Sequence, residues 1–115
     1  MKITSLEKEK KEKAKLEGAR NVYKQVPISK NDGAPRFSFR VFTIEPDGYT
    51  PFHSHPFEYE NYIIEGSGVI VTEDRESEIK TGDFLFVAPG ESHHYKNKST
   101  TKPLVMICAV QKDYE

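Results

Sequence analysis

Residues 52–60 read Phe52-His53-Ser54-His55-Pro56-Phe57-Glu58-Tyr59-Glu60, and this stretch holds two of the four histidines of the chain. In a β-strand, residues i and i+2 point to the same face, so His53 and His55 present two imidazoles on one side. Carboxylates follow within a few residues. This is the spacing of a chelating pair, and it makes metal binding the first hypothesis to test.

Length and composition describe one soluble domain. The chain has 115 residues, a formal net charge of −1 and a sequence pI near 6.4, which gives no whole-chain electrostatic reason to expect nucleic acid or a membrane as a partner. It contains no apolar run long enough to span a bilayer and no signal-like segment, so we expect a cytoplasmic protein. The single cysteine, Cys108, lies in an apolar run and is expected to be a packed thiol.

The N-terminal segment differs from the rest of the chain. Residues 1–20 carry seven Lys/Arg against four Glu, whereas residues 21–115 carry ten against fourteen acids. Residues 1–19 lack an apolar stripe, so they are expected to form a charged, solvated arm before a domain over residues 20–115. The interleaved glutamates weaken any affinity for phosphate, and we therefore expect no nucleic-acid binding.

From residue 20 onward, short β-like runs alternate with turn residues. The runs cover residues 21–26, 37–44, 62–64, 69–72, 84–87, 93–96 and 104–110. Many short strands at this spacing predict an all-β sandwich or barrel. The phenylalanines of these runs are expected in the core: Phe37, Phe39, Phe42, Phe84 and Phe86. A closed antiparallel barrel would bring His93 across from the His53/His55 pair.

Two glycine-bearing motifs now resemble those of the cupin superfamily. The first runs from Gly48 through His53-x-His55 to Gly66, and the second reads Gly82, Gly90-x2-His93 and x3-Asn97, with Ala88 where a proline usually stands. The resemblance covers about residues 20–111. It implies a single-domain, jelly-roll β-barrel, preceded here by the charged arm.

More narrowly, residues 53–60 look like the corresponding segment of compact single-domain manganese cupins, whose metal is held by four histidines. Carried over position by position, the resemblance assigns metal ligands to His53, His55 and His93. The remaining ligand position falls on Tyr59, where this chain departs from the pattern. Three alternatives stay open: Tyr59 ligates as a phenolate, Glu60 or Glu58 supplies a carboxylate, or water completes the coordination.

The residue types leave the identity of the metal open. Imidazole nitrogens suit Zn, Cu, Fe, Ni and Mn ions; the general order of affinity favours Cu or Zn, whereas the resemblance favours Mn or Fe. A barrel that binds no metal is a further alternative, because one of the four histidine ligands of the similar cupins is replaced by Tyr59 in this chain.

Two functions fit these residues. The first is a metal-dependent enzyme of the oxygenase, isomerase or lyase type, acting on a small organic molecule inside the barrel, with Tyr59 or Glu60 as ligand or proton carrier. The alternative is a non-enzymatic module that binds a small molecule or sugar. Because related small cupins are dimers, we also expect a homodimer, in which the strand over residues 20–27, or the arm before it, pairs with a second subunit. Nothing in the sequence selects a substrate.

Overall fold

The computed structural model describes residues 1–115 as strands joined by loops and short 3₁₀ turns. The strands are β1 (Glu12–Lys13), β2 (Arg20–Ile28), β3 (Phe37–Tyr49), β4 (Tyr59–Glu65), β5 (Ser67–Thr72), β6 (Glu76–Lys80), β7 (Phe84–Val87), β8 (His93–Lys96) and β9 (Leu104–Gln111). The turns are η1 (Leu6–Lys8), η2 (Lys30–Asp32) and η3 (Lys112–Tyr114). The predicted all-β class is therefore confirmed. No helix of the structure has the length and apolar character needed to cross a membrane.

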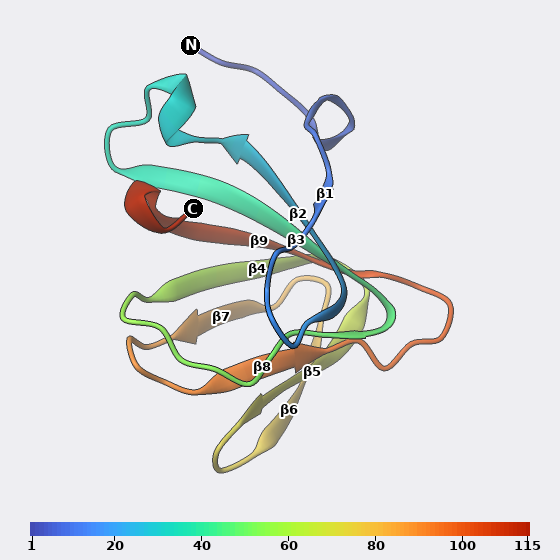
Figure 1. The fold of residues 1–115 in the computed structure, drawn as a ribbon. Helices are drawn as coiled ribbons and strands as arrows, with labels where there is room; N and C mark the ends of the chain where they lie inside the picture. Colours follow the sequence, from blue (N-terminus) through green and yellow to red (C-terminus); the bar gives the residue numbers. More distant parts are fainter.

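The strands form one antiparallel sheet that curls on itself. Its main path runs β6-β5-β8-β3-β9-β4-β7, with β2 pairing with β3 and β1 pairing with β2. Figure 1 shows the curl: β3, β9 and β4 form one wall, and β8 and β5 lie across the interior from them. The space between these walls is the interior of the predicted jelly-roll barrel.

The strand β2 has its pairing partners within the chain. Val22 lies opposite Ile44 of β3 and Lys24 lies opposite Phe42, while β1 adds Glu12 on the other edge. The premise that this strand has no pairing partner within the chain is therefore wrong, and the homodimer itself stays a prediction. The physical reason is the length of β3, whose 13 residues pair with β2 along one edge and with β9 along the other.

The charged arm lies against the sheet rather than projecting into solvent as expected. The buried Gln25 side chain donates from Nε2 to the carbonyl oxygens of Leu6 (2.7 Å) and Glu9 (3.0 Å). Lys2 contacts Asp32 at 3.0 Å. A buried amide without these carbonyls would lose its hydrogen bonds, so the arm and β2 stabilise each other.

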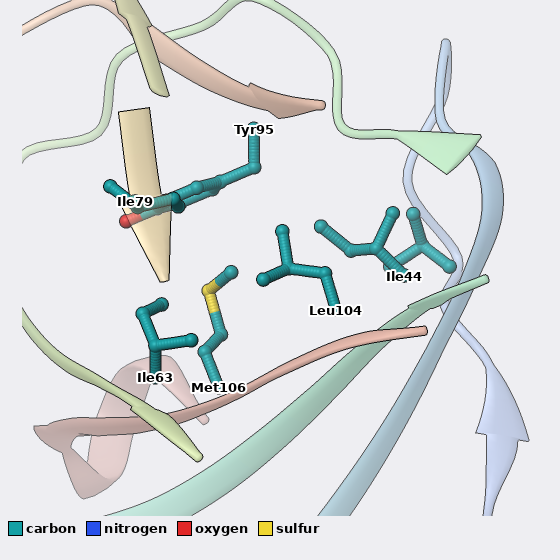
Figure 2. Packing of buried hydrophobic residues seen from close by; sticks show 7 residues of the cluster. Ile44, Ile63, Ile79, Tyr95, Leu104 and Met106 are labelled. Carbon is teal, nitrogen blue, oxygen red and sulfur yellow. The ribbon is translucent and has the colours of Figure 1, made fainter. Parts of the chain in front are cut away.

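The core lies between the two walls of the barrel. Seven buried side chains form one cluster: Val22, Ile44, Ile63, Ile79, Tyr95, Leu104 and Met106. Figure 2 shows the ring of Tyr95 of β8 extending toward Ile79 of β6, across the interior from Leu104 and Met106 of β9. The cluster ties the short strands that carry the predicted site to the long strands opposite them.

The phenylalanines depart from the prediction. Of the five expected in the core, only Phe42 packs against the buried cluster. The others expose large fractions of their surface: Phe37 62%, Phe39 42%, Phe84 82% and Phe86 64%. Strand register explains this placement, because one cross-strand row joins Phe39 to Ala109, Ala109 to Glu60 and Glu60 to Phe86. Side chains of one row share a face, and this face is the outer one.

The next row along the same strands faces the interior. Arg40 of β3 lies opposite Cys108 of β9, and Cys108 lies opposite Asn61 of β4. All three residues are buried, with 5%, 1% and 3% of their surface exposed. Alternation along each strand therefore directs a charged and a polar side chain into the barrel.

Candidate metal centre

Backbone pairing brings together two histidines of the predicted site, His53 and His93. His53 lies in the loop between β3 and β4, and this loop runs beside the start of β8. The His53 N–H donates to the carbonyl of His93 (3.2 Å), and the His93 N–H donates to the carbonyl of His53 (3.0 Å). This reciprocal pair fixes the two rings at a centroid separation of 5.5 Å.

His55 completes the cluster from the same loop. Its carbonyl accepts a hydrogen bond from the Gly90 N–H at 2.8 Å, and its ring lies 5.1 Å from that of His93. One nitrogen from each of His53, His55 and His93 lies within 4.8 Å of the others. The structure thus brings together the three histidines that the sequence singled out, from two segments about forty residues apart.

Hydrogen bonds set the direction in which two of these rings present a lone pair. His55 Nδ1 lies 2.7 Å from the carbonyl of Phe57, and His93 Nδ1 lies 2.9 Å from that of Glu91. A carbonyl accepts only from a protonated nitrogen, so each Nδ1 carries the proton and each Nε2 keeps a free lone pair. His55 Nε2 is buried without any hydrogen-bond partner. An orphaned buried acceptor that faces two other imidazoles is what a metal ligand requires.

The electrostatics of the cluster keep the imidazoles neutral. Burial lowers the pKa of His53, His55 and His93 below the ordinary value of 6.5, and repulsion among the rings lowers the pKa of His53 and His55 further. Neutral imidazole is the form that coordinates a cation. Geometry, tautomer and charge therefore all fit a divalent transition metal ion held by three nitrogens.

Tyr59 lies beside this cluster. Its ring centroid is 4.0 Å from that of His55 and 5.7 Å from that of His93. Burial raises the pKa of its phenol, and the nearby Arg40 guanidinium opposes that rise. The position that the resemblance assigns to a fourth ligand is thus occupied by a neutral, half-buried phenol next to the Arg40 guanidinium.

The two carboxylates weighed against Tyr59 lie elsewhere. Glu60 is exposed on the outer face, in the row between Ala109 and Phe86, and Glu58 is also exposed. Partial burial and the adjacent Glu58 raise the pKa of Glu60. The structure does not place either carboxylate with the three histidines, because strand alternation sends Glu60 to the face opposite Tyr59.

Two further residues of this region were not singled out by the sequence. Asn61 donates from Nδ2 to the Tyr95 hydroxyl, and its Oδ1 is buried without a partner. Arg40 places its guanidinium carbon 5.0 Å from the rings of Phe42 and Tyr59. A signal for both residues was present in the sequence. Each lies at a position where strand alternation predicts an inward, apolar side chain, so a polar or charged residue there indicates a function.

A small cavity adjoins these groups. It has a volume of about 30 Å³, and its walls include His53, Tyr59, Asn61, His93 and Cys108. That volume accommodates water rather than an organic molecule. Larger hollows, of about 430–490 Å³, lie on the outer surface and contain none of the histidines.

Comparison with known proteins places the chain in a family. The family described as "Cupin domain" matches residues 40–110. The chain therefore belongs to the cupin family, as its two glycine-bearing motifs predicted. No curated protein sequence matches the chain.

Solved structures share the fold. The polyketide cyclase RemF from Streptomyces resistomycificus is 30% identical over 97% of this chain and 80% of its own, with a TM-score of 0.92. A predicted oxalate decarboxylase from Thermotoga maritima is 24% identical over 96% and 98%, with a TM-score of 0.82. A cupin 2 conserved barrel domain protein from Rhodopseudomonas palustris is 20% identical over 90% and 72%, with a TM-score of 0.78. The last two likenesses concern the fold alone.

Proposed function

We propose that this cupin is a metal-dependent enzyme of the isomerase or lyase type that acts on a carbonyl-bearing small molecule inside the barrel. The observation that carries the proposal is the cluster of three neutral imidazoles, whose ligating nitrogens lie within 4.8 Å of one another. The likeness to a polyketide cyclase favours carbon-acid chemistry over oxygenation. The expected ion is Mn or Fe, with Zn, Ni and Cu as the other ions that these ligands accept.

A divalent ion at His53, His55 and His93 would supply Lewis-acid polarisation of a bound carbonyl oxygen. The chain itself contributes the geometry. The carbonyls of Phe57 and Glu91 hold the His55 and His93 rings in place through their Nδ1 protons. The Tyr59 phenol would either complete the coordination or carry a proton to and from the ligand, and its partial burial limits the access of bulk water to that proton.

The first test measures metal content. Protein purified without an affinity tag and loaded with Mn, Fe, Zn, Ni or Cu is expected to bind about one ion per chain. His93→Ala should lose most of this binding. His94→Ala is the matched control, because its imidazole contacts the Thr50 carbonyl and the Phe52 ring instead of the cluster. Failure of the wild-type protein to bind any of these ions would overturn the proposal.

The second test measures carbon-acid chemistry. Metal-loaded protein in D₂O is expected to exchange the protons between the two carbonyls of cyclic and acyclic 1,3-diketones, followed by NMR, faster than the metal-free protein. Unchanged exchange in all loaded forms, together with ligand binding by a folded metal-free protein, would favour the alternative of a non-enzymatic small-molecule or sugar-binding module. Oxygen consumption by the Fe-loaded protein would instead favour oxygenase chemistry.

We further propose that the chain forms a homodimer through its outer aromatic face rather than through β2. Phe39, Phe84 and Phe86 occupy two neighbouring rows of this face on β3 and β7, with Tyr62 of β4 stacked on Phe84 at 4.5 Å. A second copy offers an identical apolar surface, and a two-fold axis can cover both at once. The cytoplasmic location expected from the sequence stays a prediction.

Molecular mass in solution tests this assembly. The wild-type protein should elute with twice the mass of one chain, and the double variant Phe84→Ser/Phe86→Ser should elute as a monomer. Phe52→Ser is the control, because this exposed side chain lies in the loop before β4 and contacts the His94 ring instead of the outer aromatic face. A monomeric wild-type protein would refute the assembly without affecting the metal proposal.

A further inference from the structure

Buried polar side-chain atoms that lack a hydrogen-bond partner occur in the walls of the barrel and in the adjoining loop between β3 and β4. There are three such atoms: Arg40 Nε, His55 Nε2 and Asn61 Oδ1. His55 Nε2 belongs to the cluster of three histidines. The other two face the same interior, because Arg40, Cys108 and Asn61 form one inward cross-strand row. Buried polar atoms normally have partners, so a row with two orphans implies a ligand that supplies them.

The charge on Arg40 is also uncompensated. Its surface is 5% exposed, yet none of the five ion pairs of the chain involves it. Its hydrogen bonds go to neutral groups, from Nη2 to Cys108 Sγ (3.1 Å) and from Nη1 to the Tyr114 carbonyl (3.2 Å). A buried guanidinium is usually paired with an anion. The missing counter-ion is therefore expected to arrive with the ligand.

The Arg40 guanidinium lies near the cluster of three histidines. Its carbon lies 5.0 Å from the Tyr59 ring, and that ring lies 4.0 Å from the His55 ring. One aromatic ring thus separates Arg40 from a metal ligand. Strands are spaced by about 4.8 Å, so the backbones of Arg40 and Asn61, two strands apart, lie roughly 10 Å from each other. A molecule the size of one substituted ring spans such a site.

We propose that Arg40 and Asn61 recognise the substrate: Arg40 binds an oxyanion of the ligand, a carboxylate or a phenolate, and Asn61 Oδ1 accepts a hydrogen bond from a neighbouring hydroxyl. This assignment rests on the proposed function and names its substrate class, a small hydroxylated oxyanion with an apolar body. The flat guanidinium suits such an oxygen pair, and the rings of Phe42 and Tyr59 at 5.0 Å leave its edge for the anion.

Binding requires the end of the barrel to open. The present cavity of about 30 Å³ is too small for such a ligand. In the present structure the Tyr114 carbonyl accepts the hydrogen bond from Arg40 Nη1. The Tyr114 ring stacks on the Phe57 ring, with 4.2 Å between the centroids. Tyr114 belongs to η3 at the surface, with 39% of the residue exposed. The incoming oxyanion therefore replaces the Tyr114 carbonyl on Arg40 and displaces η3.

The test uses metal-free protein, so that it does not depend on activity. Salicylate carries the oxyanion and the hydroxyl, salicylamide lacks the charge, and benzoate lacks the hydroxyl. Wild-type protein should bind salicylate at least about tenfold more tightly than salicylamide, because a hydrogen bond to a buried charge is worth that factor. Salicylate alone should shift the amide NMR signals of residues 112–115. The pair 4-nitrophenolate and nitrobenzene shows whether a phenolate serves as well as a carboxylate.

Single substitutions show which residues cause the preference for salicylate. Arg40→Met should reduce salicylate affinity at least about tenfold and abolish the preference over salicylamide. Arg40→Lys, which keeps the charge, should retain that preference. Arg36→Gln, the matched control, removes an exposed arginine and should bind like wild type. Asn61→Ala should abolish the preference for salicylate over benzoate.

Two results would overturn the proposal: equal affinity of the wild-type protein for salicylate and salicylamide, or undiminished salicylate binding by folded Arg40→Met. The first comparison needs no variant, so an unfolded variant does not prevent refutation. Metal titration of Arg40→Met separates the two proposals, because its metal content should match that of wild type. If the wild-type protein binds salicylate but no metal, the proposed function fails and the oxyanion site stands.

Discussion

Replacing Gly66 by alanine tests how a motif glycine shapes this barrel. Gly66 forms the turn between β4 and β5 with φ of +83°, and an added Cβ would lie 2.1 Å from the carbonyl oxygen of Pro103. Gly82 provides a matched comparison. It also has a positive φ, +99°, but nothing lies within 4 Å of its added Cβ. The two substitutions share the backbone strain and differ in the steric overlap.

The magnitudes follow from these two terms. A left-handed conformation costs an L-residue roughly 1–2 kcal/mol, which is the whole expected loss for Gly82→Ala. Gly66→Ala adds an overlap with backbone that no side-chain rotation relieves, and forced overpacking costs about 1–3 kcal/mol. Its expected loss is therefore about 2–5 kcal/mol. For a domain whose free energy of unfolding is typically about 5–15 kcal/mol, this leaves the fold marginal.

Urea unfolding of the metal-free proteins, followed by circular dichroism, measures both losses at equilibrium. Gly82→Ala should shift the midpoint modestly, and Gly66→Ala should shift it by clearly more, with similar slopes. Equal destabilisation by the two substitutions would refute the reasoning, because it would mean that the approach of the Pro103 segment to the turn does not constrain residue 66.

Three further predictions concern buried polar groups. Asn97→Ala should lower the free energy of unfolding by about 2–4 kcal/mol in urea titrations, because the buried amide makes three hydrogen bonds with the backbone; no loss would contradict this. The pKa values of the three site histidines are lowered by burial, so the unfolded state binds protons at higher pH than the folded state does. The stability of the metal-free protein should therefore be full above about pH 6.5 and fall as the pH drops through the lower folded pKa values; a rise on acidification would contradict it. Cys108, whose thiol pKa is raised by burial, should react with a thiol reagent about 100-fold more slowly in native than in urea-unfolded protein, and equal rates would show that the thiol is accessible.

The fold was predictable because its signals are local. Turn glycines such as Gly66 and Gly82 fall between short alternating runs, and both proved to have positive φ. The phenylalanines misled the prediction, since hydrophobicity alone does not say which face of a strand is buried. Phe84 and Phe86 lie on one face of β7, as period-two alternation predicts, but it is Leu85 and Val87 on the other face that point inward.

The sequence by itself determined the all-β class, the cupin membership and the three histidines, because the H-x-H spacing and the motif glycines act over a few residues each. Tertiary structure decided the rest. The pairing of His53 with His93 closes the cluster of three histidines, the register that sends Glu60 outward leaves Tyr59 beside that cluster, and the row joining Arg40 to Asn61 crosses three strands. These juxtapositions depend on which residues lie opposite one another in the sheet, and a shift of one residue would exchange the two faces.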